Sequence, residues 1–300
     1  MMNISDNTLQ INAWIGLCHR DSKFPNPLRN LKYSTDNIEP SFYANGKKIN
    51  PDIILTSKKF NHSIIIDAKS KTLKEDQLEK YRTLKDSPQP LHQRGKVEII
   101  NPNHFSVDVG LSSCKQDLIN KPQIKDSLTI VRFEEEKGKI SKIKTFEGNN
   151  FEDEKLKKVF PIDLDEDRKV PTEYYPFGSQ PEDEKQLIIS VLTSILSITM
   201  EKGKDKVEVD TILEDCHPFW ERVDESMKKE LRSKVSKILN KLSKEKLDET
   251  LEKVSGTTKT EWKVVARSLQ SFQNKCQHLI DEIKDEIKQT TMEEFEDPNT

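Results

Sequence analysis

Residues 51–69 read PDIILTSKKFNHSIIIDAK, and this stretch decides the fold of the N-terminal half of the chain. The apolar run 53–55 after Pro51-Asp52 is typical of a β-strand. A polar turn over 58–61 leads into residues 63–67, Ser-Ile-Ile-Ile-Asp, a strand apolar enough to be buried on both faces of a sheet. We therefore predict two neighbouring strands at the centre of a mixed α/β domain.

Three residues whose side chains are suited to catalysis lie at the ends of these strands: Asp52, Asp67 and Lys69. If the strand ends meet at one edge, the two carboxylates lie side by side and repel each other unless a cation sits between them. Hard oxygen ligands suit Mg²⁺ or Mn²⁺. Asp67 and Lys69 are two residues apart, so their side chains share one face of the strand. The ammonium is then placed to orient or help deprotonate a water molecule and to offset charge on a phosphate.

A helix is expected directly after this strand. Thr72 and Glu75 have the spacing of a capping box, and proline residues stop the helix after about residue 86. Gln77 and Tyr81 are one helical turn apart and share a face. We predict that both side chains hydrogen-bond a phosphate or a base of a nucleic acid.

Further strands and a helix complete the expected domain, which covers residues 1–150. Residues 7–20 are expected to form a helix, and 97–100 and 127–133 to form strands. Asn45-Gly46 predicts a hairpin turn, with Phe42 and Tyr43 on one strand and residues 53–55 on the other.

This order of elements and motifs resembles the PD-(D/E)xK nuclease superfamily, and QLEKY (77–81) resembles the QxxxY extension of its RecB- and Cas4-like branches. The resemblance implies a restriction-endonuclease-like mixed sheet flanked by helices, a metal held by Asp52 and Asp67, and hydrolysis of phosphodiesters that leaves a 5′-phosphate. Many members add an acid from the first helix, but residues 7–20 contain none. Asp21, Glu39 and His19 remain alternatives for the third ligand, with Glu39 favoured. The iron–sulfur cysteines of Cas4 are absent.

A structural interpretation competes at each position. Asp52 alone reads as a turn residue after Pro51, and Asp67 with Lys69 reads as an exposed ion pair of little energetic value. Because Asp67 follows three isoleucines, an unpaired carboxylate there is costly. That context favours the functional interpretation.

Composition excludes several classes of protein. Of the 300 residues, 34% are charged and 33% hydrophobic, and no apolar run is long enough to cross a bilayer. The start of the sequence lacks a secretory signal, and the four cysteines lack metal-clamp spacing. We expect a cytoplasmic protein with no membrane partner. The net charge of −3 hides an asymmetry, because residues 1–95 hold 15 Lys+Arg against 10 Asp+Glu.

Residues 151–182 combine acidic clusters with prolines, which predicts a linker or wrapping arm. Residues 183–300 are expected to be mainly helical, over 184–200, 207–216, 224–243 and 266–290, with a strand pair around a polar turn at 255–260.

This order in the C-terminal region resembles a winged helix-turn-helix. In such modules the third helix enters the major groove, which makes Lys228, Lys229 and Arg232 candidate DNA contacts. A helical dimerisation or partner-docking unit explains the same pattern equally well.

The sequence therefore predicts a metal-dependent DNA endonuclease with Asp52, Asp67 and Lys69 as its catalytic residues. A C-terminal region binds nucleic acid or dimerises. An RNA endonuclease of the same superfamily is the first alternative. A non-catalytic DNA-binding or assembly protein on a nuclease scaffold is the second. A double-strand cut requires two active sites, so we expect a homodimer or a partner protein.

Overall fold

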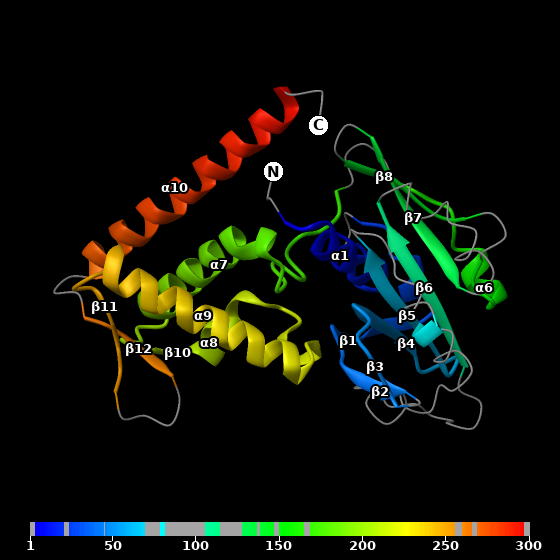
Figure 1. The fold of residues 1–300 in the computed structure, drawn as a ribbon, viewed down its shortest axis with the longest axis horizontal. Coiled ribbons are helices and arrows are strands. Elements are labelled where there is room, and N and C mark those ends of the chain that lie inside the picture. Colours follow the sequence, from blue (N-terminus) through cyan, green and yellow to red (C-terminus); the bar gives the residue numbers. More distant parts are fainter. Residues whose placement is uncertain are drawn as a thin grey trace. The chain divides into compact units, whose positions relative to one another are not determined.

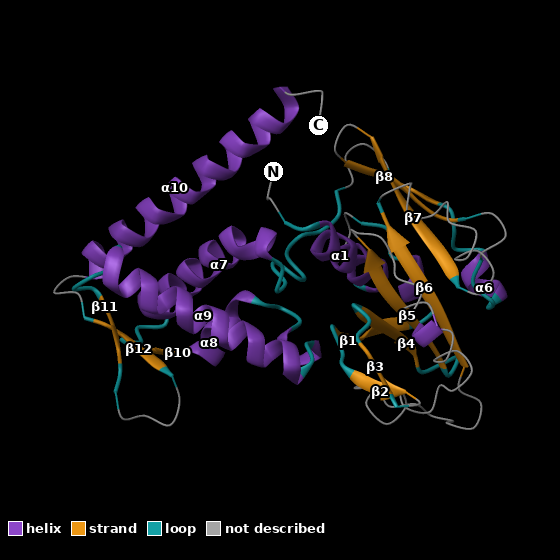
Figure 2. Ribbon diagram, viewed as in Figure 1, coloured by secondary structure: helices purple, strands orange, loops and turns teal. Residues whose placement is uncertain are grey.

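The computed structural model of the chain contains two compact units. It describes residues 4–20, 24–44, 46–69, 79–81, 106–114, 128–136, 139–146, 150–164, 169–255, 260–265 and 269–296. The first compact unit, here called the sheet unit, comprises Asp6–Tyr174 and Glu221–Ser226. The second, the helical unit, comprises Met1–Ser5, Tyr175–Trp220 and Met227–Thr300. The predicted α/β class and the mainly helical C-terminal part are confirmed (Figures 1 and 2).

A mixed sheet forms the centre of the sheet unit. Its described strands, in spatial order, are β1 (Tyr33–Ile38), β4 (Ile53–Ser57), β5 (His62–Lys69), β6 (Ser106–Ser113), β7 (Thr129–Glu136), β8 (Lys139–Thr145) and β9 (Ile162–Asp163). The pairs β5–β6 and β6–β7 are parallel, and the other neighbours are antiparallel. β5 is an interior strand of this sheet, and its Ile64, Ile65 and Ile66 are all fully buried, as predicted for a strand covered on both faces.

Each face of the sheet has its own apolar layer. Helix α1 (Asp6–Cys18) packs against β1, β4 and β5 (Figure 1). Its Ile11, Trp14 and Ile15 are fully buried. The short helix α2 (Pro27–Asn30) follows it. On the other face a cluster of buried residues joins Ile65 to Tyr81, in a short helical stretch over 79–81. β6 fits tightly, since a Cβ at Gly110 would lie 2.7 Å from Ile66 Cδ1.

A separate two-stranded hairpin lies beside the sheet. β2 (Phe42–Ala44) pairs with β3 (Lys47–Ile49), and Gly46 has the positive φ of 75° that a tight turn needs. The predicted turn position is right, but the predicted return strand is wrong. The chain turns back immediately after Gly46, and residues 53–57 pair with β1 and β5 instead.

The segment predicted as a linker belongs in part to the sheet unit. Residues 150–164 supply the short helix α6 (Glu154–Lys157) and strand β9. Phe151 and Leu156 are fully buried, and the rings of Phe151 and Phe160 stack at 5.4 Å. The buried apolar residues alternate with charged ones, so the average composition of the segment conceals a packed face. The predicted boundaries at 150 and 182 stay predictions.

The helical unit combines helices with a small antiparallel sheet (Figure 2). The elements from 181 onward are, in chain order, η3 (Pro181–Asp183), α7 (Glu184–Leu196), the π-helical turn η4 (Ser197–Glu201), β10 (Lys206–Glu208), α8 (Val209–Cys216), η5 (Trp220–Arg222), α9 (Glu225–Glu245), β11 (Leu251–Lys253), β12 (Glu261–Val264) and α10 (Leu269–Glu296). Residues 221–226, at the end of η5 and the start of α9, belong to the sheet unit. The described strands lie in the order β10-β12-β11, and α10 packs on α7. Among the described helices, none is long and apolar enough to cross a membrane.

Two buried polar groups shape the core of the helical unit. His217 is fully buried, with its ring 4.9 Å from that of Tyr175, 5.5 Å from Phe177 and 5.9 Å from Trp220. Asp183 is also fully buried and accepts hydrogen bonds from Ser5 N, Ser5 Oγ and the backbone N–H of Gly178. The first group is enclosed by aromatic rings, whereas the second is satisfied by hydrogen bonds.

Candidate active site

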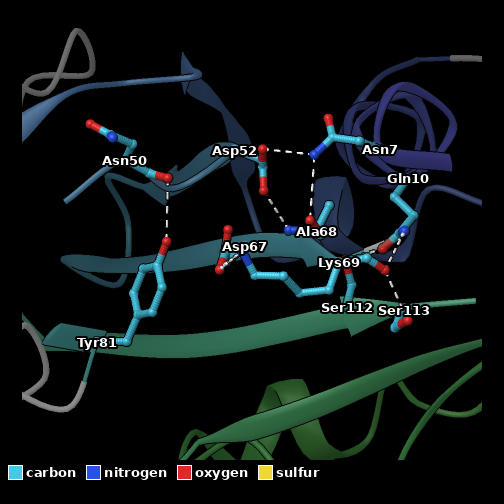
Figure 3. Close-up of polar contacts among 10 residues, drawn as sticks. All are labelled: Asn7, Gln10, Asn50, Asp52, Asp67, Ala68, Lys69, Tyr81, Ser112 and Ser113. Carbon is cyan, nitrogen blue, oxygen red and sulfur yellow. Dashed lines mark hydrogen bonds and ion pairs between the residues drawn. The ribbon is translucent and has the colours of Figure 1, made fainter. Parts of the chain in front are cut away.

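The register between β4 and β5 brings the two predicted carboxylates together. Ile53 pairs with Ile66, and Asp52 N donates to Ile66 O at 3.0 Å, so Asp52 lies opposite Asp67. The strands are antiparallel, so Asp52 precedes the first residue of β4 whereas Asp67 lies near the end of β5. Side chains directly opposite each other project on the same face of a sheet. The carboxylates of Asp52 and Asp67 therefore lie near each other on the same face of the sheet (Figure 3).

Asp67 is a buried acid with an ammonium beside it. It is 2% exposed, and Lys69 Nζ lies 2.5 Å from its Oδ2. Burial raises the pKa of Asp67 well above its usual range, and the charge of Asp52 raises it further, whereas Lys69 opposes both effects. Buried Asp67 and half-buried Asp52 thus lie beside one cationic side chain, and two carboxylates with one ammonium favour an additional positive charge.

Asp52 is held in place by two donors. Its Oδ2 accepts from the backbone N–H of Ala68 at 2.6 Å, and its Oδ1 accepts from Asn7 Nδ2 at 2.8 Å. Asn7 lies in the first turn of α1, the helix in which the superfamily resemblance leads one to expect an acid. Sequence analysis missed this residue because only the packing of α1 on β4 and β5 brings its amide to Asp52. The two hydrogen bonds fix the orientation of the carboxylate.

Tyr81 contributes a hydroxyl group to the same face. It is 4% exposed, and its Oη donates to Asn50 O at 3.3 Å. Burial raises its pKa well above the ordinary value, and the charges of Asp67 and Asp52 add to this effect. The hydroxyl therefore keeps its proton and acts as a donor. Its predicted partner Gln77 lies outside the described residues.

Glu39 is close to the site through its backbone. Its N–H donates to Asp52 O at 2.7 Å, and its own φ is 48°, in the left-handed region. The residue is half-buried. Its role as a third ligand stays a prediction.

A second set of polar side chains supports the end of β5. Lys69 O accepts from Ser113 Oγ at 2.9 Å and from Gln10 Nε2 at 3.4 Å. Gln10 Oε1 in turn accepts from Ser112 Oγ at 2.7 Å. Gln10 and Ser112 are fully buried. Neither residue was predicted, because the packing of α1 against β6 brings together positions 102 residues apart.

The donor set fits a hard divalent cation. Mg²⁺ keeps several of its waters and is often bound by one or two carboxylates. Asp52 and Asp67 supply two, and apart from its ion pair with Lys69 the buried Oδ2 of Asp67 makes no hydrogen bond within the described residues. Those residues contain no group of three or more His, Cys, Asp or Glu side chains that could hold a metal. The fit therefore rests on the two opposed carboxylates.

The three predicted contacts on α9 have different environments. Lys229 is exposed. Lys228 Nζ lies 5.5 Å from the centre of the Trp220 ring. Arg232 is paired with Asp210, with 2.5 Å between Nε and Oδ1. Lys237 and Lys241 are exposed as well, eight and twelve residues after Lys229, so they lie on the same side of the helix.

Comparison with known proteins assigns the sheet unit to a family. The family model described as the MJECL32 domain matches residues 6–175, more than half of the chain. The chain belongs to the MJECL32 domain family. A second model, a domain of unknown function named DUF8601, matches residues 180–295. The two matches meet near the boundary between the sheet unit and the helical unit.

One relative from this comparison is the uncharacterized protein MJECL32 of Methanocaldococcus jannaschii. It is 30% identical over 258 residues, which cover 81% of this chain and 58% of the relative. The chain therefore spans less than two thirds of that archaeal protein. No solved structure matches the chain.

Proposed function

We propose that this member of the MJECL32 domain family is a metal-dependent nuclease of the PD-(D/E)xK type that hydrolyses phosphodiester bonds in DNA. One observation carries the proposal: buried Asp67 lies opposite Asp52 in register, with Lys69 Nζ 2.5 Å from its carboxylate. A surface ion pair would not account for an acid that is only 2% exposed.

The order of elements supports a restriction-endonuclease-like core. α1 is followed by the antiparallel strands β1, β4 and β5, then by the helical stretch at 79–81, and then by β6 parallel to β5. This order is compatible with the mixed sheet flanked by helices and the two-strand metal site that the resemblance implies, with the β2–β3 hairpin inserted between β1 and β4.

The roles of the residues follow from their positions. Asp52 and Asp67 would hold Mg²⁺ or Mn²⁺, which when bound supplies an activated water and charge for the phosphate. Lys69 is placed to orient the attacking water and to offset the charge that develops on the phosphate. Tyr81 keeps its proton, and to donate it to a phosphate oxygen it would exchange its bond to Asn50 O. Asn7 keeps the Asp52 carboxylate oriented.

The test is incubation with supercoiled, linear and single-stranded DNA and with RNA, in Mg²⁺ or Mn²⁺. Lys69→Ala should lower the cleavage rate by about 100- to 1,000-fold, the usual loss when one charge-stabilising donor is removed. Lys59→Ala, at an exposed turn at the other end of β4, is the matched control. Cleavage that survives both Lys69→Ala and EDTA would refute the proposed site.

For the helical unit we propose a winged helix-turn-helix that binds nucleic acid or dimerises. The order α7, β10, α8, α9, β11, β12 and the pairing of β12 with both β10 and β11 support this assignment. Lys229, Lys237 and Lys241 form an exposed row on α9, the third helix. Because Arg232 is paired with Asp210, these lysines are better candidates for phosphate contacts.

The salt dependence of DNA binding tests this assignment. Removing one lysine that binds a phosphate should reduce the slope of log affinity against log salt by about 0.9 on duplex DNA. Replacing Lys229, Lys237 and Lys241 with alanine should therefore reduce it by about 2 to 3. The control variant replaces Lys275, Lys284 and Lys288 of α10. An unchanged slope in the α9 variant would favour dimerisation, which sedimentation measures directly.

The two alternatives keep specific predictions. An RNA endonuclease would cleave RNA in preference to DNA in the same assay. A non-catalytic binding protein finds support in the small donor set, since the described residues offer no group of three metal ligands. It would bind nucleic acid without cleaving any substrate in Mg²⁺ or Mn²⁺.

A further inference from the structure

The β2–β3 hairpin presents an exposed aromatic ring on a fixed support. Tyr43 is 63% exposed, and Lys48, its partner across the hairpin, is also exposed. On the opposite face Phe42 and Ile49 are each 2% exposed and belong to the core cluster. One face of the hairpin is therefore anchored, while the other carries an aromatic ring beside an ammonium in solvent.

Two contacts tie the hairpin to the candidate active site. Lys47 Nζ lies 3.2 Å from Glu79 Oε2, and Glu79 lies in the same helical turn as Tyr81. Tyr81 Oη donates to the carbonyl of Asn50, which follows β3 directly. Lys48 and Asp52 are four positions apart in the chain, so their Cα atoms lie within about 14 Å of each other. That distance corresponds to about four nucleotides of a stacked strand.

The local charge suits a polyanion. The hairpin segment 41–50, SFYANGKKIN, contains two lysines and no acid. A flat aromatic ring next to lysines is the combination with which proteins bind single-stranded nucleic acids, because every base has a face for stacking and every nucleotide a phosphate. In a duplex the base faces are covered by neighbouring pairs, and only base edges are accessible in the grooves.

We propose that the β2–β3 hairpin is a stacking platform for single-stranded nucleic acid, with Tyr43 under a base and Lys48 on a neighbouring phosphate. The platform selects an unpaired strand as the substrate of the adjacent site. This inference rests on the proposed nuclease function for its role in cleavage, but its binding step stands apart from catalysis.

Binding is measured in the Asp67→Asn variant, so that no substrate is cleaved. The readout is the fluorescence anisotropy of labelled single-stranded oligo(dT), single-stranded oligo(U) and a blunt DNA duplex. Each probe is about 15 nucleotides or base pairs long, which spans one site. Tyr43→Ala should weaken binding of the single strands by about 5- to 150-fold, the range for loss of one stacked base. Duplex affinity should stay unchanged. Tyr43→Trp should retain affinity, and its fluorescence should be quenched by either single strand. The DNA and RNA arms show which sugar the platform accepts.

Lys48→Ala has a matched control in Lys58→Ala, at an exposed turn at the other end of β4. Only the former should reduce the salt slope for a single strand, by about 0.7 for one phosphate. The proposal is overturned if Tyr43→Ala leaves single-strand affinity unchanged, or weakens single strand and duplex alike.

Failure of the nuclease proposal looks different. In that case the unmodified protein cleaves nothing in Mg²⁺ or Mn²⁺, while the Tyr43 effect on single-strand binding persists. If the protein cleaves DNA but Tyr43→Ala leaves single-strand binding unchanged, only the platform is refuted.

Discussion

Acidification should weaken the helical unit through His217, and replacing this residue with phenylalanine should remove the effect. His217 lies among the rings of Tyr175, Phe177 and Trp220, and within the described residues neither ring nitrogen has a hydrogen-bond partner. Burial lowers its pKa from 6.5 to about 3. The folded protein therefore keeps the imidazole neutral at a pH where the unfolded chain binds a proton.

The sign and size follow from linkage. As pH falls below 6.5 the unfolded state takes up a proton that the folded state refuses, so stability is lost until the pH approaches 3. Within that window the free energy of unfolding falls by about 1.4 kcal/mol per pH unit. Between pH 7 and pH 5 the loss from this one residue is about 2 kcal/mol.

Hydrogen–deuterium exchange of the α8 and α9 amides, corrected for intrinsic rates at each pH, reports the opening free energy of the helical unit within the full chain. His217→Phe should lack the component of about 2 kcal/mol, whatever constant offset its different shape introduces. His278→Gln, at an exposed histidine of α10, should respond to pH like the unmodified protein. Parallel pH profiles for His217→Phe and the unmodified protein would refute the reasoning.

Three further predictions concern the sheet unit. Mg²⁺ at about a hundredfold excess over its dissociation constant should stabilise this unit by about 2.7 kcal/mol, which raises its melting temperature by about 5 to 11 °C. Asp67→Asn should abolish this shift. An equal shift in both proteins would exclude Asp67 as a ligand. Asn7→Ala should weaken Mg²⁺ affinity by about 10- to 100-fold, measured by calorimetry, because Asp52 loses the donor that orients it; unchanged affinity would mean that Ala68 N suffices. Ser112→Ala should cost about 1–3 kcal/mol in urea unfolding, because it leaves the buried Gln10 Oε1 without its donor, whereas Ser106→Ala at the exposed start of β6 should be neutral.

The strands that form the candidate site could be predicted because their sequence signal is local. Three consecutive isoleucines specify a buried strand, and the spacing from Asp52 to Asp67 allows one turn between two antiparallel strands. Alternation along the strand then places Asp67 and Lys69 on one face, as their 2.5 Å ion pair requires. The expectation that the carboxylates converge needed no information from distant parts of the chain.

Features that depend on distant pairings could not be predicted. β6 reads SVDVGLSS, in which serines, aspartate and glycine suggest a loop. These small residues are required because the strand lies parallel to β5 and one face meets α1, where Ser112 contacts Gln10. Asn7 was overlooked for the same reason. Only the packing of α1 on β4 and β5 places its amide against Asp52.

Composition misled the interpretation of residues 150–164. Acidic clusters and prolines over the whole of 151–182 suggested a linker, yet Phe151, Leu156 and Phe160 are buried. An averaged charge count cannot detect apolar residues that each occupy one position on a packed face. Acids and lysines occupy the exposed positions between them.

The hydrogen bonds between Ser5 and Asp183 affect when the helical unit can fold during synthesis on the ribosome. Ser5 is bound to a carboxylate 178 residues later in the chain. At about 5–20 residues per second, translation separates the appearance of these two residues by about 9 to 36 s. Ser5 therefore reaches its native partner only after most of the sheet unit has been translated. A substitution at Ser5 should therefore disturb the folding of the helical unit, although Ser5 precedes the sheet unit in sequence.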